Sequence, residues 1–337
     1  MNTRRARWVL VLALFAGVIA GCSPLRGILA PSPGMSAEWA PLLEDVRVFV
    51  RRIGFEDTEN FLDLSVDQES FPFCGYASSL HLPYSYEDPA IRWVESVTEQ
   101  ECRKFGQGAD VYFGAVEALG EVGTPVTPSM ITGKLDRFVY LVIHEDCHDQ
   151  FELPYGIEEA LCNLITYKAM AVFAEEKFKW FAGEGRAIRR YAEEQSRLTR
   201  ETITHYEKLA ALYARFQRGE IAADVLMRDR AVLFSEAERP LAWTKGALNN
   251  VSIANDMTYS RHYPFLESVF DALGRDLART VAFFRHVDEI KPSKESVMQQ
   301  QRIADESSVQ FIRAYEAAVM ETISRALPEK SGSAGRR

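Results

Sequence analysis

The spacing of apolar residues predicts a protein built mainly from helices. Apolar side chains recur every three or four positions over residues 37–52, and the same spacing returns in four later stretches. A period of 3.6 residues is typical of a helix that buries one face. Three of the later stretches are 186–216, 266–287 and 304–327. The fourth follows 186–216, reaches residue 238 and is ended by Pro240. Because Gly219 separates this fourth stretch from 186–216, we expect the two to form a long helical hairpin.

A small β element is expected before the middle of the chain. Residues 54–103 are rich in aromatic residues and proline and have little periodicity, which indicates loops and short strands. Residues 110–116 form a short apolar run that is closed by Gly120 and Gly123, as a strand would be. The sequence therefore predicts a mainly α fold, α+β with a small β element, in one domain over residues 38–328.

The N-terminal residues have the composition of a bacterial lipoprotein signal. Three arginines fall within the first seven residues, an apolar run covers 8–20, and small residues stand directly before Cys22. This succession predicts a signal peptide over 1–21, a lipid on Cys22 and a Ser/Pro/Gly-rich tether over 22–37. The protein would then be lipid-anchored to a membrane of the cell envelope, facing the periplasm. Ser23 favours the outer membrane, and a plain signal peptide or an uncleaved anchor is the alternative.

The charge of the chain argues against a nucleic-acid-binding protein. The formal net charge is −9, with acidic and basic residues interspersed, so no basic face for nucleic acid is expected. The Ser/Gly/Arg-rich residues 329–337 are expected to form a disordered tail.

Four further cysteines would occupy a compartment that oxidises thiols, which favours disulfides. Proximity in sequence suggests Cys74 with Cys102, and Cys147 with Cys162 would join two helices. Four cysteines allow three pairings, and free buried cysteines are the other possibility. Cys147 as a metal ligand is a further alternative, although thiolates are typical of closed structural sites.

One motif indicates a particular chemistry. Residues 144–148 read His-Glu-Asp-Cys-His, the HExxH pattern. On a helix, residues four apart share a face, so His144 and His148 can bind one Zn²⁺ ion. Glu145 would then lean toward a water on that ion and act as its base.

A catalytic zinc site needs a third protein ligand and an open position. After the motif, Pro154 and Gly156 predict a turn, and a second helix begins with the adjacent Glu158 and Glu159. We expect Glu159 to be the ligand, as in gluzincins, with Glu158 as the alternative, because neighbouring positions on a helix differ by about 100°. The pair could also be only an acidic first turn that complements the helix dipole. Asn163, one turn further on, is expected to hold the ligand in orientation, as is Glu158 if it does not bind the metal.

The chain resembles a family of bacterial lipoproteins that are predicted aminopeptidases, zinc peptidases with an HExxH motif. It departs from the family pattern at Glu158, where the family has Asn, and at Asp146 and Cys147, where the family has a small apolar pair. The matching pieces are the segment at Cys22, residues 110–112 with the stretch that follows, 141–150, 158–160, 211–213, 249–250, 258–259 and 264–265.

The resemblance implies a zincin-like helical metallopeptidase core that hydrolyses peptides, with an aminopeptidase-like preference. Zinc peptidases commonly place a hydroxyl or imidazole donor opposite the metal, which makes Tyr259 and His262 candidates for stabilising the oxyanion. An ordinary tyrosine and a surface histidine are the alternative. A catalytically inactive envelope lipoprotein that binds a partner is the rival function.

Overall fold

A computed structural model describes residues 39–65, 70–120, 123–178, 182–241 and 248–328. The predicted signal peptide, the lipid site at Cys22, the tether and the tail over 329–337 lie outside the described residues. Within the described ranges, every helix is too short or too polar to cross a bilayer.

The described chain is mostly helical with one small sheet, which confirms the predicted fold class. The elements in chain order are α1 (Trp39–Arg52), β1 (Phe71–Ala77), β2 (Arg92–Glu95), α2 (Glu99–Phe105), β3 (Asp110–Val116), α3 (Pro128–Thr132), α4 (Leu135–His148), α5 (Tyr155–Lys177), α6 (Gly183–Gln217), α7 (Ala223–Leu241), α8 (Asn250–Ser260), α9 (Tyr263–Ala272), α10 (Leu277–Ile290), α11 (Lys294–Gln301) and α12 (Val309–Ala326).

The sheet is antiparallel, with the strand order β2-β1-β3. Cys74 in the central strand pairs with Val94 on one side and Phe113 on the other. A disulfide joins Cys74 to Cys102 of α2, with 5.5 Å between the Cα atoms, and so ties α2 to the sheet. This pairing and the strand predicted over 110–116 are both confirmed.

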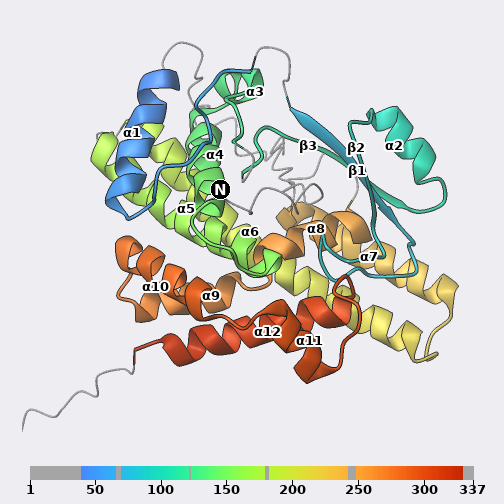
Figure 1. The fold of residues 1–337 in the computed structure, drawn as a ribbon. Coiled ribbons are helices and arrows are strands. Elements are labelled where there is room, and N and C mark those ends of the chain that lie inside the picture. The colour runs from blue at the N-terminus through green and yellow to red at the C-terminus, as the bar shows by residue number, and fades with distance from the viewer. Residues whose placement is uncertain (1–38, 66–69, 121–122, 179–181, 242–247, 329–337) are drawn as a thin grey trace, which may run out of the picture.

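Helices α4 and α5 form the centre of the fold. Every residue of α4 is buried, and α5 contacts α4, α6, α8 and α9. Figure 1 shows α4 and α5 with α1 on one side, the sheet on the other, and α9 to α12 below them. Because α4 is buried all round, the histidine motif at its end lies in the interior.

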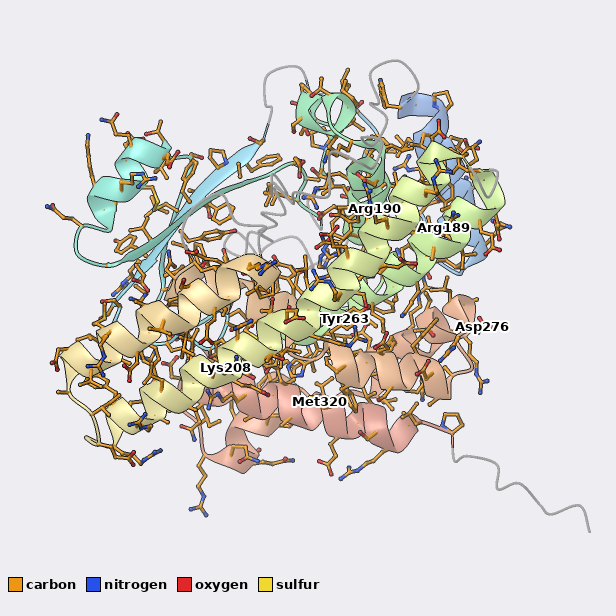
Figure 2. All side chains as sticks on the ribbon, turned by 180° about the vertical axis from the view of Figure 1, so that it is seen from behind. Arg189, Arg190, Lys208, Tyr263, Asp276 and Met320 are labelled. Carbon is orange, nitrogen blue, oxygen red and sulfur yellow. A yellow bond between two sulfur atoms is a disulfide. The ribbon has the colours of Figure 1, made fainter. Side chains whose placement is uncertain are left out.

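The predicted helical hairpin is present as α6 and α7. Figure 2 shows α6 running obliquely across the back of the molecule, with Arg190 and Lys208 labelled along it. The predicted end before Pro240 is wrong by a short margin, because α7 continues through that proline to Leu241. Pro240 cannot donate to the carbonyl of Glu236 and its ring crowds that carbonyl, so the helix ends one residue after the proline.

Two other helix predictions are wrong in extent. Residues 266–287 form parts of two helices, α9 and α10, because Gly274 and Arg275 adopt positive φ angles of 82° and 59° and Asp276 then caps α10. The helix predicted from residue 304 begins at Val309, where Ser308 caps it. Helices α2, α3, α8 and α11 were not predicted.

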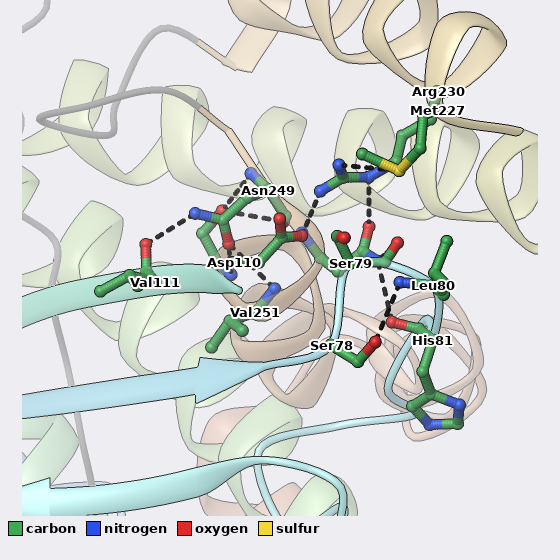
Figure 3. Close-up of polar contacts among 12 residues, drawn as sticks. Ser78, Ser79, Leu80, His81, Asp110, Val111, Met227, Arg230, Asn249 and Val251 are labelled. Atoms are coloured by element: carbon green, nitrogen blue, oxygen red, sulfur yellow. Dashed lines mark hydrogen bonds and ion pairs between the residues drawn. The ribbon is translucent and has the colours of Figure 1, made fainter. Parts of the chain in front are cut away.

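Helix α8 is held against β3 and α7 by polar contacts of the residues at its start (Figure 3). Asn249 caps α8 and donates its Nδ2 hydrogen to the carbonyl of Val111 at 2.7 Å. The backbone N–H of Asn250 donates to Asp110 Oδ2 at 2.9 Å, and Arg230 pairs with the same carboxylate. These bonds fix where the later residues of α8 lie.

Candidate metal centre

The two helices that carry the predicted ligands are joined at the site. The chain turns between His148, the last residue of α4, and Tyr155, the first of α5. A second disulfide links Cys147 of α4 to Cys162 of α5, with 5.5 Å between the Cα atoms, which confirms the suggested pairing. The Sγ of Cys147 is therefore committed to a disulfide and is not a metal ligand.

His144, His148 and Glu159 converge on one point. The two Nε2 atoms are 3.2 Å apart, and Glu159 Oε2 lies 3.3 Å from that of His144 and 3.4 Å from that of His148. In a tetrahedral site with metal–ligand distances near 2.0–2.1 Å, neighbouring ligand atoms are about 3.3–3.4 Å apart.

The chemistry of these atoms also fits a cation. All three side chains are buried, and in the described part of the chain neither oxygen of Glu159 has a conventional hydrogen bond. Two imidazole nitrogens facing each other beside a buried carboxylate are costly unless something shares them. The group could therefore hold a divalent metal ion.

Glu158 points away from this group. Its Oε1 lies 2.9 Å from His148 Nδ1, and its Oε2 accepts the backbone N–H of Leu153 at 2.9 Å. The two adjacent glutamates thus reach opposite nitrogens of one imidazole, His148. This arrangement orients the ring so that Nε2 faces the group.

Asn163 acts on the group through an aromatic neighbour. Its Oδ1 accepts the hydroxyl of Tyr140 at 2.9 Å, and the Tyr140 ring stacks on the imidazole of His144 with 5.1 Å between centroids. Tyr140 is fully buried and was not singled out from the sequence. Its position four residues before His144, on the same helix face, was the signal available.

Burial and mutual charge perturb the pKa values of the group. Burial lowers the pKa of His144 to about 4. Burial alone would raise the pKa of Glu159, but the positive charge on His148 and the closeness of both imidazoles lower it to about 2. Burial likewise opposes charge on His148, but Glu159 and Glu158 outweigh it and raise the pKa of His148 well above its usual value. Of the two imidazoles, the group as it stands therefore favours a neutral His144 and a positively charged His148.

Glu145 lies beside the group and is held by a backbone N–H. Its Oε2 accepts the N–H of Gly120 at 2.6 Å, and burial raises the pKa of Glu145 to about 7. A Cβ added to Gly120 would lie 3.0 Å from that oxygen and 3.2 Å from the Cβ of His148. Gly120, interpreted from the sequence only as the end of a strand, also admits the carboxylate.

Tyr259 lies close to the group, on the buried helix α8. Burial raises its pKa well above the usual value, and the negative charges of Glu159 and Glu145 add to the effect. Burial and the charge of Glu159 do the same to Tyr155, the first residue of α5. The structure therefore brings a second tyrosine, which the sequence did not indicate, beside the predicted one.

His262 is held by a residue from the C-terminal part of the chain. Its Nε2 lies 3.1 Å from Oε2 of Glu316 on α12, and the same oxygen accepts the hydroxyl of Tyr84 at 2.6 Å. All three side chains are buried. The suggested role of His262 as a donor to the oxyanion stays a prediction.

Comparison with known proteins adds one finding. Searches of curated proteins and of solved structures gave no match. A family described as "Putative aminopeptidase" matches residues 95–301, which include α4, α5 and α8. Because this match covers more than half of the chain and all the residues of the candidate metal centre, the chain belongs to that aminopeptidase family.

Proposed function

We propose that the protein is a zinc-dependent peptidase in which His144, His148 and Glu159 hold the ion and Glu145 transfers protons. The observation that carries the proposal is the set of three ligand atoms spaced 3.2–3.4 Å apart in a buried site. Two nitrogens and one carboxylate oxygen are the donor set of many catalytic zinc sites.

When bound, zinc would supply a Lewis acid that acidifies water and polarises a carbonyl. Glu145 accepts the proton of the attacking water and returns it to the leaving amine. A pKa of about 7 suits both roles, because a base and an acid work best near the ambient pH. The hydroxyl of Tyr259 donates a hydrogen bond to the developing oxyanion, and Tyr155 holds that tyrosine in place.

We propose peptides as substrates, with the aminopeptidase-like preference that the family implies. We further propose that the enzyme works in the bacterial cell envelope, anchored by a lipid on Cys22. Residues 4–22 support this location, because arginines are followed by an apolar run and then by small residues directly before Cys22.

The first test replaces Glu145 by Gln. We expect the variant to keep about one zinc ion per chain by elemental analysis and to lose hydrolysis of a mixed peptide library by at least a hundredfold. Glu152→Gln is the matched control, since Glu152 is exposed in the turn between α4 and α5. A Glu145→Gln variant that still cleaves peptides would remove the assignment of the base. Purified wild type with neither metal nor activity would favour the inactive partner-binding lipoprotein.

A second pair of variants tests the third ligand. Glu159→Ala should lose zinc, whereas Glu158→Ala should bind it more weakly but still bind it, because Glu158 contacts only the far nitrogen of His148. Dialysis against defined zinc concentrations, followed by elemental analysis, measures both. The opposite order of affinities would assign the ligand to Glu158.

A further inference from the structure

Helix α8 has a buried polar side that the proposed chemistry uses only in part. Every residue of α8 is buried. Val251 and Ala254 pack one side of the helix on the sheet. Ile253 and Met257 pack another side on α6 and α7. At 100° per residue, the remaining side carries Asn255, Asp256 and Tyr259.

Two oxygens on this side lack a partner. Asn255 is 2% exposed and Asp256 is 8% exposed, yet Oδ1 of Asn255 and Oδ2 of Asp256 accept no hydrogen bond from any described residue. Asn255 lies close enough to Asp256 to favour its charged form and so oppose the rise in its pKa, yet the two acceptors stay without a donor. A buried acceptor without a donor costs stability, so such pairs are rare without a ligand.

The neighbourhood of Asp256 also lacks a positive charge. Burial raises its pKa well above the usual value, and Asn255 is the one described group that opposes this rise. Tyr112 of β3 is an ionisable neighbour of Asp256. Burial raises the pKa of Tyr112, and the negative charge of Asp256 raises it further. A cation would satisfy both the charge and the free lone pairs.

These oxygens stand on the same side of α8 as Tyr259, the tyrosine near the candidate metal centre. Asn255 and Asp256 precede Tyr259 by four and three residues, and helix residues at those separations are neighbours, about 5–6 Å apart at Cβ. Tyr259 in turn lies near Glu159 and Glu145. Tyr259 therefore connects the candidate metal centre with the side of α8 that carries the two acceptors.

We propose that Asn255 and Asp256 bind the protonated α-amino group of the peptide, so that the site acts on free amino termini. An ammonium group has three donors and no acceptor, which matches two acceptors with no donor between them. In a peptide that amine is two bonds from the first carbonyl carbon. Anchoring it one helical turn from Tyr259 places the first peptide bond beside the metal centre. The inference rests on the proposed function and defines its substrate as peptides with an unblocked terminus.

The test compares a leucine-initiated pentapeptide with its N-acetylated form. For wild type, we expect kcat/KM to favour the free amine by at least tenfold. Asp256→Asn should reduce that preference at least tenfold, through a higher KM for the free peptide, while the rate on the acetylated peptide stays within twofold. Asp224→Asn, an exposed carboxylate in the first turn of α7, is the control and should behave as wild type. Zinc content should be equal in all three proteins.

Binding measured without turnover separates this inference from the proposed function. Calorimetry with leucine amide should show binding to wild type, at least tenfold weaker binding to Asp256→Asn, and no binding of N-acetyl-leucine amide. Equal cleavage of both peptides by wild type, or an unchanged preference in the variant, would overturn the anchor and leave the peptidase standing. Asp256-dependent binding of leucine amide by a protein that cleaves nothing would support the anchor and refute the peptidase. Absence of both would refute both.

Discussion

Removing the disulfide between α4 and α5 should weaken the metal centre as well as the fold. Cys147 and Cys162 are 15 residues apart, and closing a loop of that length stabilises the native state by about 3 kcal/mol through the entropy of the unfolded chain. The double variant Cys147→Ala/Cys162→Ala should lose about that much. Because the two cysteines stand on the helices that carry the ligands, we also expect zinc affinity to fall about tenfold, as when an outer partner of a ligand is lost.

The other disulfide supplies a matched control. Cys74 and Cys102 are 28 residues apart, which corresponds to about 3.5 kcal/mol, but they tie α2 to the sheet and touch neither ligand helix. Urea unfolding of the metal-free proteins measures the first effect, and zinc competition with a chromophoric chelator measures the second. Similar losses of stability with a loss of zinc affinity in only the first variant would support the reasoning. Equal zinc affinity in the two variants would refute it.

Three other substitutions test contacts around the site. Glu158→Gln should lower zinc affinity about 10–100-fold in the chelator assay, since a carboxylate that orients an imidazole is lost; unchanged affinity would show that the contact is idle. Gly156→Ala places a methyl group 2.5 Å from Oε1 of Glu316 and should cost about 1–3 kcal/mol in urea unfolding, whereas Gly183→Ala meets no atom within 4 Å and should cost nothing; equal effects would contradict this. Asp256→Asn should stabilise the protein at neutral pH. Burial raises the pKa of Asp256 in the folded protein well above its usual value of 3.8, so wild type loses stability as pH rises above 3.8 toward the folded pKa. Urea unfolding at several pH values should therefore show the gain at pH 7 and none below 3.8, and a gain of equal size at both would refute the cause.

The main helices could be predicted because their signals are local. The break between α9 and α10 was missed because Leu273 and Leu277 are four residues apart, so the apolar period continues across the turn. The glycine and the capping aspartate between them were the better evidence. Helix α8 gave no amphipathic pattern because all of its sides are buried.

The site was predictable where it depends on spacing along one helix and obscure where it depends on distant segments. The motif histidines and the adjacent glutamates follow from helix geometry. Gly120 is 25 residues before the carboxylate it binds, and Tyr84 is 232 residues from Glu316. Contacts of that kind arise from tertiary packing, which no local pattern encodes.

Glu316 has a practical consequence for the boundaries of the protein. The segment that matches the family ends at residue 301, yet α12 beyond it carries the carboxylate that binds His262 and the hydroxyl of Tyr84. A truncated chain cut at the family boundary would expose two buried polar groups and the apolar face that α12 covers, including the neighbours of Phe311 and Val319. Expression of this protein for crystallisation should therefore retain every residue through at least 326, because the recognisable segment is smaller than the unit that folds.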